Sequence, residues 1–574
     1  MRIMKNIPAR IRAAGMLLVS AGAFSFLLWR TIGPANAQGP RNIDWPFYGN
    51  DAANTRYQNV DQINPSNIKN LQPAWIFHTK NHDTKASMEL SPIVVNGTMY
   101  ITDGDDEVFA LNAATGQQQW EYQPNDMPPF SQLLLCCSRN NRGVAVGAGK
   151  VFLGRLDATL VALDAGTGTQ LWRAVVDDYT DGYSITMAPQ FIDGKVIVGV
   201  AGGEYLIRGH VDAYDAKTGT RLWRFYTTDP KTFAGDSWQT GGGPIWQTPA
   251  FDAGLGMLYV STGNAGPDIN AQEREGTNLF TACIVALDIQ TGQVRWFFQE
   301  VHHDLWDYDS TPPVVLFTVN NTPALGHAGK SGFMFILDRR TGTPLFPVAE
   351  VPVPTTPSWQ NPWPTQPESA VESLTPHSIT SVPPGFTAAP MWTVPQNTPL
   401  VIQPASSGGL EWQPMAFSPR TGFIYHGTRY APQVFQTHPG NVGGTLPGWG
   451  STTDNVPGIV GYGLYGAINT ATGKIAWKIN VTDAAGSGVL VAGDLVFFGE
   501  INGNFRGVSA ASGDLLWSFD ATTITNAGSP TAAPIAYMVN GCEFIANAFG
   551  GNPNEGSANK SGDAVIAFTL PGMQ

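Results

Sequence analysis

Charged residues are scarce in this chain of 574 residues, because Asp, Glu, Lys and Arg together make up only 13% of it. So low a charge content excludes a long disordered tail and argues against a helical enzyme. Basic residues are also outnumbered, 32 against 45 acidic ones, and the formal net charge is −13. An acidic surface repels phosphate polymers, which excludes nucleic acid as a partner. Such a surface suits solubility, or attraction of a basic electron-accepting protein.

Cysteine is rarer still, with four residues, namely Cys136, Cys137, Cys283 and Cys542. No Cys-x-x-Cys-His motif occurs, so we expect no covalently attached c-type haem on this chain. Any one-electron relay must then be a separate protein. Adjacent cysteines such as Cys136 and Cys137 are unusual, because they bridge only through a strained eight-membered ring that needs supporting surroundings. From the residues alone, two ordinary buried thiols remain the alternative.

Long apolar runs are absent except at the N-terminus, where basic residues precede the run from Ala13 to Trp29 and the small-x-small site Ala35-Asn36-Ala37 follows it. This pattern predicts an export signal over residues 1–37, cleaved near Ala37, with residues 38–574 as the mature periplasmic domain. The run is slightly long and Arg30 interrupts its exit, so a retained membrane anchor is the alternative. Membrane association is expected only in that case.

Glycine (64 residues) and proline (43 residues) are abundant, which is typical of short strands and turns and predicts an all-β fold. One pattern recurs along the chain: a strand, an acidic or polar residue, Thr-Gly, and a tryptophan four residues after the glycine. Its glycines, which define eight units with Thr421-Gly422 as a degenerate copy, are Gly116, Gly168, Gly219, Gly292, Gly342, Gly422, Gly473 and Gly513.

Each unit alternates apolar residues on both sides of its turn, which predicts a hairpin. A four-stranded sheet cannot bury both faces alone, so the units must pack face to face, with the tryptophans filling the gaps. We therefore predict an eight-bladed β-propeller with docking tryptophans; an open β-solenoid is the alternative. Strands 74–77 and 565–568 are expected to pair and close the last blade. The stretch 347–413 is expected to form loops over one face.

Three oxygen-bearing residues stand in separate units: Glu204 in Ala-Gly-Gly-Glu-Tyr, Asn264 in Ser-Thr-Gly-Asn, and Asp307 in His-His-Asp-Leu-Trp-Asp-Tyr-Asp. Two carboxylates and an amide suit a hard cation with oxygen ligands. Trp246, in Gly-Gly-Gly-Pro-Ile-Trp, lies outside the repeat position and is otherwise one more core aromatic. Lys330, in Gly-Lys-Ser-Gly-Phe, is otherwise an ordinary surface lysine.

The tryptophan repeat, the Cys-Cys-Ser-Arg-Asn-Asn-Arg-Gly motif and these segments resemble the quinoprotein alcohol dehydrogenases that use pyrroloquinoline quinone, over nearly the whole mature chain. The resemblance implies a Cys136–Cys137 disulfide on one face of the quinone and Trp246 on the other, without a cytochrome domain. It implies Asp307 as the catalytic base and Ca²⁺ or a lanthanide held by Glu204, Asn264 and Asp307. The residues it places against the quinone are Glu89, Cys136, Cys137, Arg142, Thr186, Gly202, Gly203, Trp246 and Lys330.

Asp309 lies two residues after Asp307, so in an extended chain both side chains point to one side. In the resembling family an acid here accompanies lanthanide use, but related sugar and polyol dehydrogenases carry it with divalent ions, so the metal stays open. His302 and His303 are expected to support this loop. The sequence differs from the pattern of the resembling family at five positions, namely Ala201, Pro244, Arg429, Ala485 and Asn552. The smaller residues at the last two positions imply a roomier pocket.

The resemblance thus implies oxidation of an alcohol larger than methanol, or a polyol, with electrons passed to a soluble cytochrome c or a membrane quinone. Two other function classes remain open from the sequence. A secreted propeller of the same repeat class can act as a non-catalytic scaffold. A carbohydrate-active propeller would use paired acids for hydrolysis and would need no quinone site.

Overall fold

The computed structural model of the chain describes residues 42–441, 446–482, 485–554 and 560–573. This part contains forty strands, eight short 3₁₀-helices and no α-helix. No helix in it has the length and apolar character needed to span a membrane. The export signal predicted for residues 1–37 lies outside the described residues.

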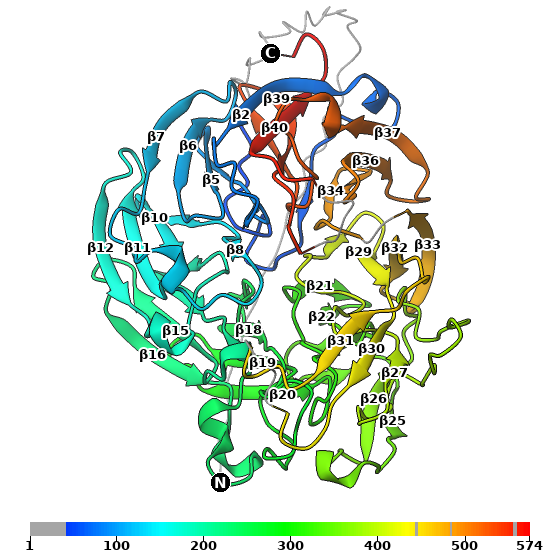
Figure 1. The fold of residues 1–574 in the computed structure, drawn as a ribbon. Helices are drawn as coiled ribbons and strands as arrows, with labels where there is room; N and C mark the ends of the chain where they lie inside the picture. The colour runs from blue at the N-terminus through cyan, green and yellow to red at the C-terminus, as the bar shows by residue number, and fades with distance from the viewer. Residues whose placement is uncertain (1–41, 442–445, 483–484, 555–559, 574) are drawn as a thin grey trace, which may run out of the picture. The chain divides into compact units, whose positions relative to one another are not determined.

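Eight sheets of four or five strands make up most of the described chain, and their strands pair antiparallel apart from one added strand, β1 (Figure 1). The first four sheets are β4 (Ile93–Val95), β5 (Thr98–Thr102), β6 (Val108–Asn112) and β7 (Gln118–Tyr122); β9 (Ala145–Gly147), β10 (Lys150–Gly154), β11 (Thr159–Asp164) and β12 (Gln170–Val175); β13 (Gln190–Ile192), β14 (Lys195–Gly199), β15 (His210–Asp215) and β16 (Arg221–Tyr226); and β17 (Ala250–Asp252), β18 (Met257–Ser261), β19 (Cys283–Asp288) and β20 (Val294–Gln299).

The other four sheets are β21 (Val315–Val319), β22 (Thr322–Ala328), β23 (Met334–Asp338) and β24 (Thr343–Pro344); β28 (Ala416–Ser418), β29 (Phe423–Tyr430), β32 (Tyr462–Asn469) and β33 (Lys474–Val481); β34 (Leu490–Ala492), β35 (Leu495–Gly499), β36 (Asn504–Ser509) and β37 (Leu515–Asp520), with β1 (Tyr57–Gln58) parallel to β34; and β38 (Ile535–Val539), β39 (Cys542–Phe549) and β40 (Ala564–Thr569), with β2 (Gln72–His78).

Smaller elements lie between these sheets. They are the strands β3 (Ala86–Ser87), β8 (Arg139–Asn140), β25 (Val348–Pro352), β26 (Thr365–Ser369), β27 (Leu400–Ile402), β30 (Gln433–Gln436) and β31 (Thr452–Asn455), and the helices η1 (Ile68–Asn70), η2 (Phe130–Gln132), η3 (Tyr179–Asp181), η4 (Gly203–Tyr205), η5 (Pro230–Thr232), η6 (Ser237–Thr240), η7 (Ser358–Gln360) and η8 (Ala521–Thr523). The stretch 347–413, expected as loops alone, therefore also contains β25, β26, β27 and η7.

The acid and the glycine of the Thr-Gly turn each have a structural role. In the turn between β11 and β12, the Asp164 carboxylate accepts the backbone N–H groups of Gly166 and Thr167. Gly168 then has a φ of +71°, which glycine adopts without steric cost. A Cβ at this glycine would lie 2.6 Å from the Trp120 ring of the preceding sheet. The glycine therefore serves both the turn and the packing of neighbouring sheets.

Tryptophans join successive sheets in one closed cycle. The indole N–H of Trp120 donates to the carbonyl of Ala165 in the next sheet, at 3.0 Å, and the same kind of contact recurs from sheet to sheet. These further contacts are Trp75 to Ala113, Trp172 to Ala216, Trp223 to Ile289, Trp296 to Arg339, Trp477 to Ala510 and Trp517 to Leu71, with Phe346 packing against Gly473 at the remaining junction. The predicted propeller with docking tryptophans is confirmed.

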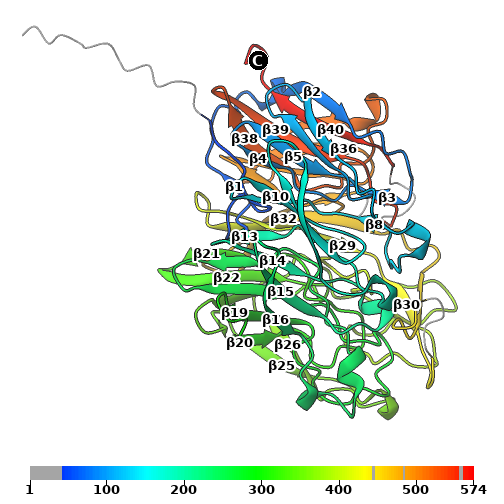
Figure 2. The same cartoon turned by 90° about the vertical axis from the view of Figure 1, so that its left-hand side faces the viewer.

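The cycle closes where the two ends of the domain meet. β2 pairs antiparallel with β40, with Ile76 opposite Ile566, as the sequence predicted, and both views show the two strands together (Figures 1 and 2). The eighth sheet is this one, and it has no Thr-Gly turn because its outer strand comes from the other end of the chain. Counting Thr421-Gly422 as a unit was wrong: that turn joins β28 to β29, and a Cβ at Gly422 would contact nothing within 4 Å.

Candidate cofactor and metal site

One cavity of about 350 Å³ gathers residues from several sheets. Ten of the residues singled out from the sequence line it: Cys136, Cys137, Arg142, Thr186, Gly202, Glu204, Trp246, Asp307, Asp309 and Lys330. Its size falls in the range of about 300–1,000 Å³ that is typical of small-molecule sites. Loops between strands supply most of the lining, which is the usual place for function in a propeller.

The adjacent cysteines form a disulfide, which confirms that part of the sequence interpretation. Cys136 and Cys137 precede β8 in a loop whose outer residue, Cys137, is exposed. A carboxylate oxygen of Glu204 lies within 4.8 Å of both sulfur atoms. The disulfide is therefore a wall of the same cavity that Glu204 and Trp246 line.

Arg142 and Glu89 form a buried ion pair, with 2.6 Å between guanidinium and carboxylate. Glu89 also accepts hydrogen bonds from Asn140 and Asn552, and Arg142 donates to the Thr186 hydroxyl at 3.0 Å. The guanidinium lies 4.8 Å from the Trp246 ring centroid. Its Nε is buried without a hydrogen-bond partner in the described part of the chain. A buried unpaired N–H of a cation is a ready donor for an anionic ligand.

Asp307, Asp309 and Lys330 meet at the cavity. The Lys330 Nζ lies 2.9 Å from Asp307 Oδ2 and 2.7 Å from Asp309 Oδ2. Burial raises the pKa of Asp307 well above its usual value, although the Lys330 ammonium opposes this. The chain is not extended at Asp307, whose φ is +63°, so the argument that alternation aligns the two carboxylates was wrong. They converge because this left-handed backbone turns them toward one lysine.

Asn264 and Glu204 approach the same carboxylates from other loops. The Asn264 backbone N–H donates to Asp309 Oδ1 at 2.9 Å, and its side-chain amide donates to Asp268 Oδ1 at 2.7 Å. Burial first, and then the charge of Glu204, raise the pKa of Asp268 well above its usual value. Burial also raises the pKa of Glu204. Carboxylates so crowded and buried are stabilised by a cation.

The loop that carries Asp307 is held by its neighbours. Asp304 accepts the backbone N–H groups of Trp306 and Tyr308, at 3.1 and 2.8 Å. His303 contacts the carbonyl oxygens of Gly276 and Gln360, and His302 contacts Gln299 and Glu350. Neither histidine lines the cavity. Both support the loop, as expected from the sequence.

The residues present fit both implied groups. Four carboxylates (Glu204, Asp307, Asp309 and Glu411) line the cavity with Lys330. Asp268 lies behind this lining, and its Oδ2 is buried without a hydrogen-bond partner in the described chain. This donor set suits a calcium or lanthanide ion. The aromatic Trp246, the disulfide and the unpaired Arg142 Nε suit a flat anionic quinone.

Three predicted site residues do not line the cavity but contact or adjoin residues that do. Glu89 holds Arg142, Asn264 holds Asp309, and Gly203 begins η4 next to Gly202. Sequence reasoning missed Asp268, although it lies only four residues after Asn264. It also missed Asn140, which lies within the Cys-Cys-Ser-Arg-Asn-Asn-Arg-Gly motif, and lining residues outside any recognised motif, namely Ser184, Ser406, Ser407, Glu411, Gln433, Trp449 and Thr453.

Ala485 and Asn552, expected to widen the substrate end, do not line this cavity, and neither does Arg429. Asn552 instead donates its side-chain amide to Glu89, at 2.5 Å. Ala485 is buried, and its Cβ lies 2.7 Å from the point a Cβ on Gly427 would occupy. These three positions therefore give no support to the prediction of a larger substrate pocket.

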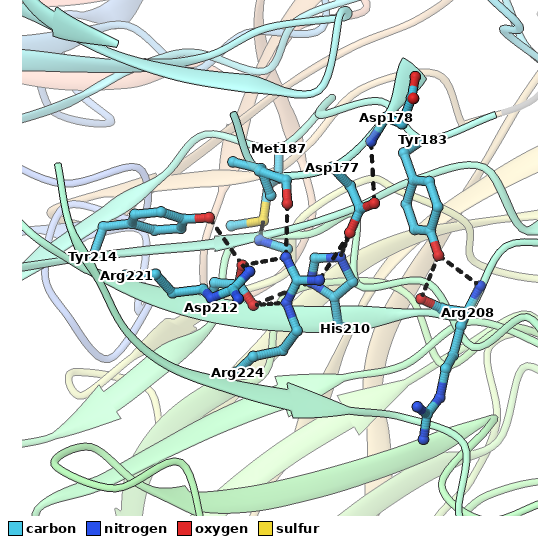
Figure 3. A network of polar contacts seen from close by, with 12 residues as sticks. Asp177, Asp178, Tyr183, Met187, Arg208, His210, Asp212, Tyr214, Arg221 and Arg224 are labelled. Atoms are coloured by element: carbon cyan, nitrogen blue, oxygen red, sulfur yellow. Dashed lines mark hydrogen bonds and ion pairs between the residues drawn. The ribbon is translucent and has the colours of Figure 1, made fainter. Parts of the chain in front are cut away.

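A second polar cluster joins residues of β15 and β16 to Asp177 (Figure 3). His210 lies between Asp177 and Asp212, at 3.1 and 3.2 Å, and Arg224 contacts both carboxylates at 2.8 Å. Burial raises the pKa of Asp177, but the His210 hydrogen bond and the Arg224 charge outweigh it and lower the pKa to about 2. Burial also raises the pKa of Asp212, but the His210 and Arg224 contacts outweigh it and lower that pKa. Acids whose pKa values are lowered in this way do not donate protons near neutrality, so this pair does not support the hydrolase alternative.

The comparisons with known proteins agree with this geometry. Residues 45–456 match the family model described as "Glucose/ethanol/alcohol dehydrogenase, beta-propeller domain", and residues 402–558 also match one described as "Outer membrane protein assembly factor BamB". The chain is 34% identical to a quinohemoprotein alcohol dehydrogenase of Comamonas testosteroni, covering 90% of this chain and 73% of the relative.

It is equally 34% identical to a lanthanide-dependent methanol dehydrogenase of Methylorubrum extorquens, covering 82% of this chain and 81% of the relative. A solved europium-containing methanol dehydrogenase superimposes with a TM-score of 0.77 at 28% identity, covering 92% of this chain and 98% of that one. With the disulfide, the aromatic wall and the carboxylate cluster in one cavity of a propeller, the chain belongs to the family of quinoprotein alcohol dehydrogenases that use pyrroloquinoline quinone.

Proposed function

We propose that this protein is a periplasmic dehydrogenase that oxidises an alcohol larger than methanol, or a polyol, with pyrroloquinoline quinone and Ca²⁺ or a lanthanide ion. The observation that carries the proposal is the meeting of the Cys136–Cys137 disulfide, Trp246, Arg142 and the carboxylate cluster in one cavity. When bound, pyrroloquinoline quinone would supply a hydride acceptor and the cation would supply Lewis-acid chemistry.

The chain's own residues take three roles. Asp307 accepts the proton of the alcohol hydroxyl as general base. Lys330, whose Nζ lies 2.9 Å from Asp307 Oδ2, supplies positive charge where negative charge develops. Arg142, held by Glu89 and Thr186, offers its remaining N–H to a quinone carboxylate.

Small side chains support the larger substrate. Beside Trp246 and Trp449, the cavity wall contains five small residues, namely Ser184, Ala201, Gly202, Ser406 and Ser407. Serine hydroxyls at this wall also match the hydroxyl groups of a polyol. This argument replaces the one drawn from Ala485 and Asn552.

Export and electron transfer complete the proposal. The basic residues, apolar run and Ala-Asn-Ala site within residues 1–37 support export with cleavage near Ala37. The acidic composition supports attraction of a basic electron acceptor, either a soluble cytochrome c or a membrane quinone reached from the periplasm. The non-catalytic scaffold has no support, since the relatives named above are dehydrogenases.

Reconstitution tests the proposal. The mature protein is mixed with pyrroloquinoline quinone and either Ca²⁺ or La³⁺, quinone binding is measured by absorbance, and dye reduction is followed over a panel from methanol to sugars and polyols. Asp307→Ala should abolish turnover, while the exposed control Asp181→Ala should not. Absence of quinone binding with either metal would remove the proposal, and appreciable turnover by Asp307→Ala would remove the base assignment.

A further inference from the structure

Asp268 is a buried acid whose two oxygens have different surroundings. The residue is 1% exposed, and Oδ1 accepts a hydrogen bond from the Asn264 side-chain amide at 2.7 Å. Oδ2 is buried without any hydrogen-bond partner among the described residues. Leaving an acid oxygen buried and unsatisfied is costly, so a native protein keeps one where something else neutralises it.

Basic side chains near Asp268 are committed elsewhere. Lys330 contacts Asp307 and Asp309. Arg274 donates to the carbonyl oxygens of Pro267, Asp268 and Asp304, and to Asn278 Oδ1. In the described chain no ion pair reaches the Asp268 carboxylate. The charge that opposes an ionised Asp268 would therefore come from a bound cation, because no side chain of the described residues supplies it.

The contact with Asp268 also fixes the Asn264 amide. An ionised carboxylate only accepts hydrogen bonds, so the group that faces Asp268 is the –NH₂ of Asn264. This –NH₂ also donates to the Ala265 carbonyl, at 3.3 Å. Both donor interactions direct the amide oxygen away from Asp268, which leaves that oxygen as the end available to a cation.

Backbone hydrogen bonds through Gly448 connect Asp268 to Glu204, another expected metal ligand. Its backbone N–H donates to the Gly448 carbonyl at 2.6 Å, and the Gly448 N–H donates to the Glu204 carbonyl at 2.8 Å. The electrostatic neighbours of Asp268 are Glu204, Asp309 and Lys330. Asp268 thus lies beside the expected cation site, in the same loop between β18 and β19 as Asn264.

We propose that Asp268 is a positioning residue of the cation site, which orients Asn264 through Oδ1 and, through the charge on Oδ2, favours a trivalent lanthanide over Ca²⁺. The inference rests on the proposed function, since it concerns the same cation. At equal distances the attraction of one added negative charge grows in proportion to the cation's charge, so it stabilises a 3+ ion more than a 2+ ion.

Two substitutions separate the two roles. Asp268→Asn keeps an acceptor oxygen for Asn264 but removes the charge. Asp268→Ala removes both. Asp268→Glu keeps the charge with a changed geometry, and the exposed Asp181→Asn is the matched control for loss of one negative charge.

Binding is measured on the full mature protein with pyrroloquinoline quinone, by terbium luminescence with Ca²⁺ as competitor, and folding is checked by thermal melting. Asp268→Asn should lower the preference for Tb³⁺ over Ca²⁺ by about tenfold, within the usual effect of residues behind metal ligands. Asp268→Ala should in addition weaken both ions. Asp268→Glu and Asp181→Asn should keep the wild-type preference.

An unchanged preference in Asp268→Asn, or a folded Asp268→Glu that loses the preference as Asp268→Ala does, overturns the proposal. Failure of the proposed function looks different, because the wild-type protein would then bind neither ion with the quinone. If Asp268→Asn does not fold, the Asp268→Glu result decides, since its charge is retained.

Discussion

The backbone N–H of Gly448 donates a hydrogen bond to the carbonyl oxygen of Glu204, at 2.8 Å. Gly448 belongs to the insertion between β29 and β32, which also carries β30 and β31, whereas Glu204 lies on η4 between β14 and β15. Two segments more than 200 residues apart in the sequence thus meet behind the cation site. The contact leaves no room for a side chain, because a Cβ on Gly448 would lie 2.8 Å from the Glu204 oxygen.

Gly448→Ala should therefore displace Glu204 and weaken metal binding by about tenfold, the low end for changes behind metal ligands. Terbium titration of the quinone-loaded protein measures this effect. Gly166→Ala is the control, since its Cβ would meet only Asp164, at 3.4 Å. Equal affinities of the two variants would show that this contact does not position Glu204.

Asp309→Ala should selectively remove lanthanide-supported turnover, because a trivalent ion depends more on each anionic ligand. Steady-state rates of dye reduction with Ca²⁺ and with La³⁺ are compared for the variant and the wild-type protein. In this variant Lys330 keeps its ion pair with Asp307, so its charge stays partly balanced. If the variant works equally well with both ions, Asp309 is not a ligand.

Gly168→Ala should destabilise the fold by more than about 2 kcal/mol, from strain at positive φ and the clash with Trp120. The midpoint of thermal unfolding is the measurement. Gly166→Ala, two residues away in the same turn, should lie within about 0.5 kcal/mol of the wild-type protein. Similar losses in both variants would contradict the docking role of this glycine.

Glu543 gives a pH dependence outside the site. Burial raises its pKa from 4.5 to about 7, although the Gln62 and Ile63 N–H groups, which both bond Oε2, oppose this. A raised pKa in the folded acid means that folding favours the protonated form, so its stabilisation is complete below pH 4.5 and is lost as the pH rises to 7.

Glu543→Gln does not titrate, so it should gain stability relative to the wild-type protein between pH 5 and pH 8, by at most about 3 kcal/mol. Thermal melting across this range measures the difference. The exposed Glu121→Gln serves as control and should show no such trend. A constant difference between Glu543→Gln and the wild-type protein at all pH values would refute the assignment.

The repeat was readable from the sequence because most of its turns share the same local chemistry: an acid or amide accepts backbone N–H groups, and a glycine adopts positive φ. In the last turn Ser509 takes the place of the acid. The pairing of β2 with β40 was also predictable, since an unpaired edge strand is unfavourable. The unit at Thr421-Gly422 was miscounted for the same reason, because a turn motif reports a local conformation and does not say which strands of a sheet it joins.

The sequence by itself determined the propeller repeat, since the repeat depends on local spacing. The resemblance of its motifs to those of the quinoprotein alcohol dehydrogenases implied the disulfide and the residues of a quinone and cation site. Only the tertiary structure decided that Asp268 lies beside Asn264, that Gly448 fastens Glu204, and that Asn552 bonds Glu89 and does not line the cavity. The Gly448–Glu204 and Asn552–Glu89 contacts join loops far apart in the chain, and the packing of whole sheets fixes their partners. Asn264 and Asp268 share the loop between β18 and β19, whose conformation no local sequence pattern indicates.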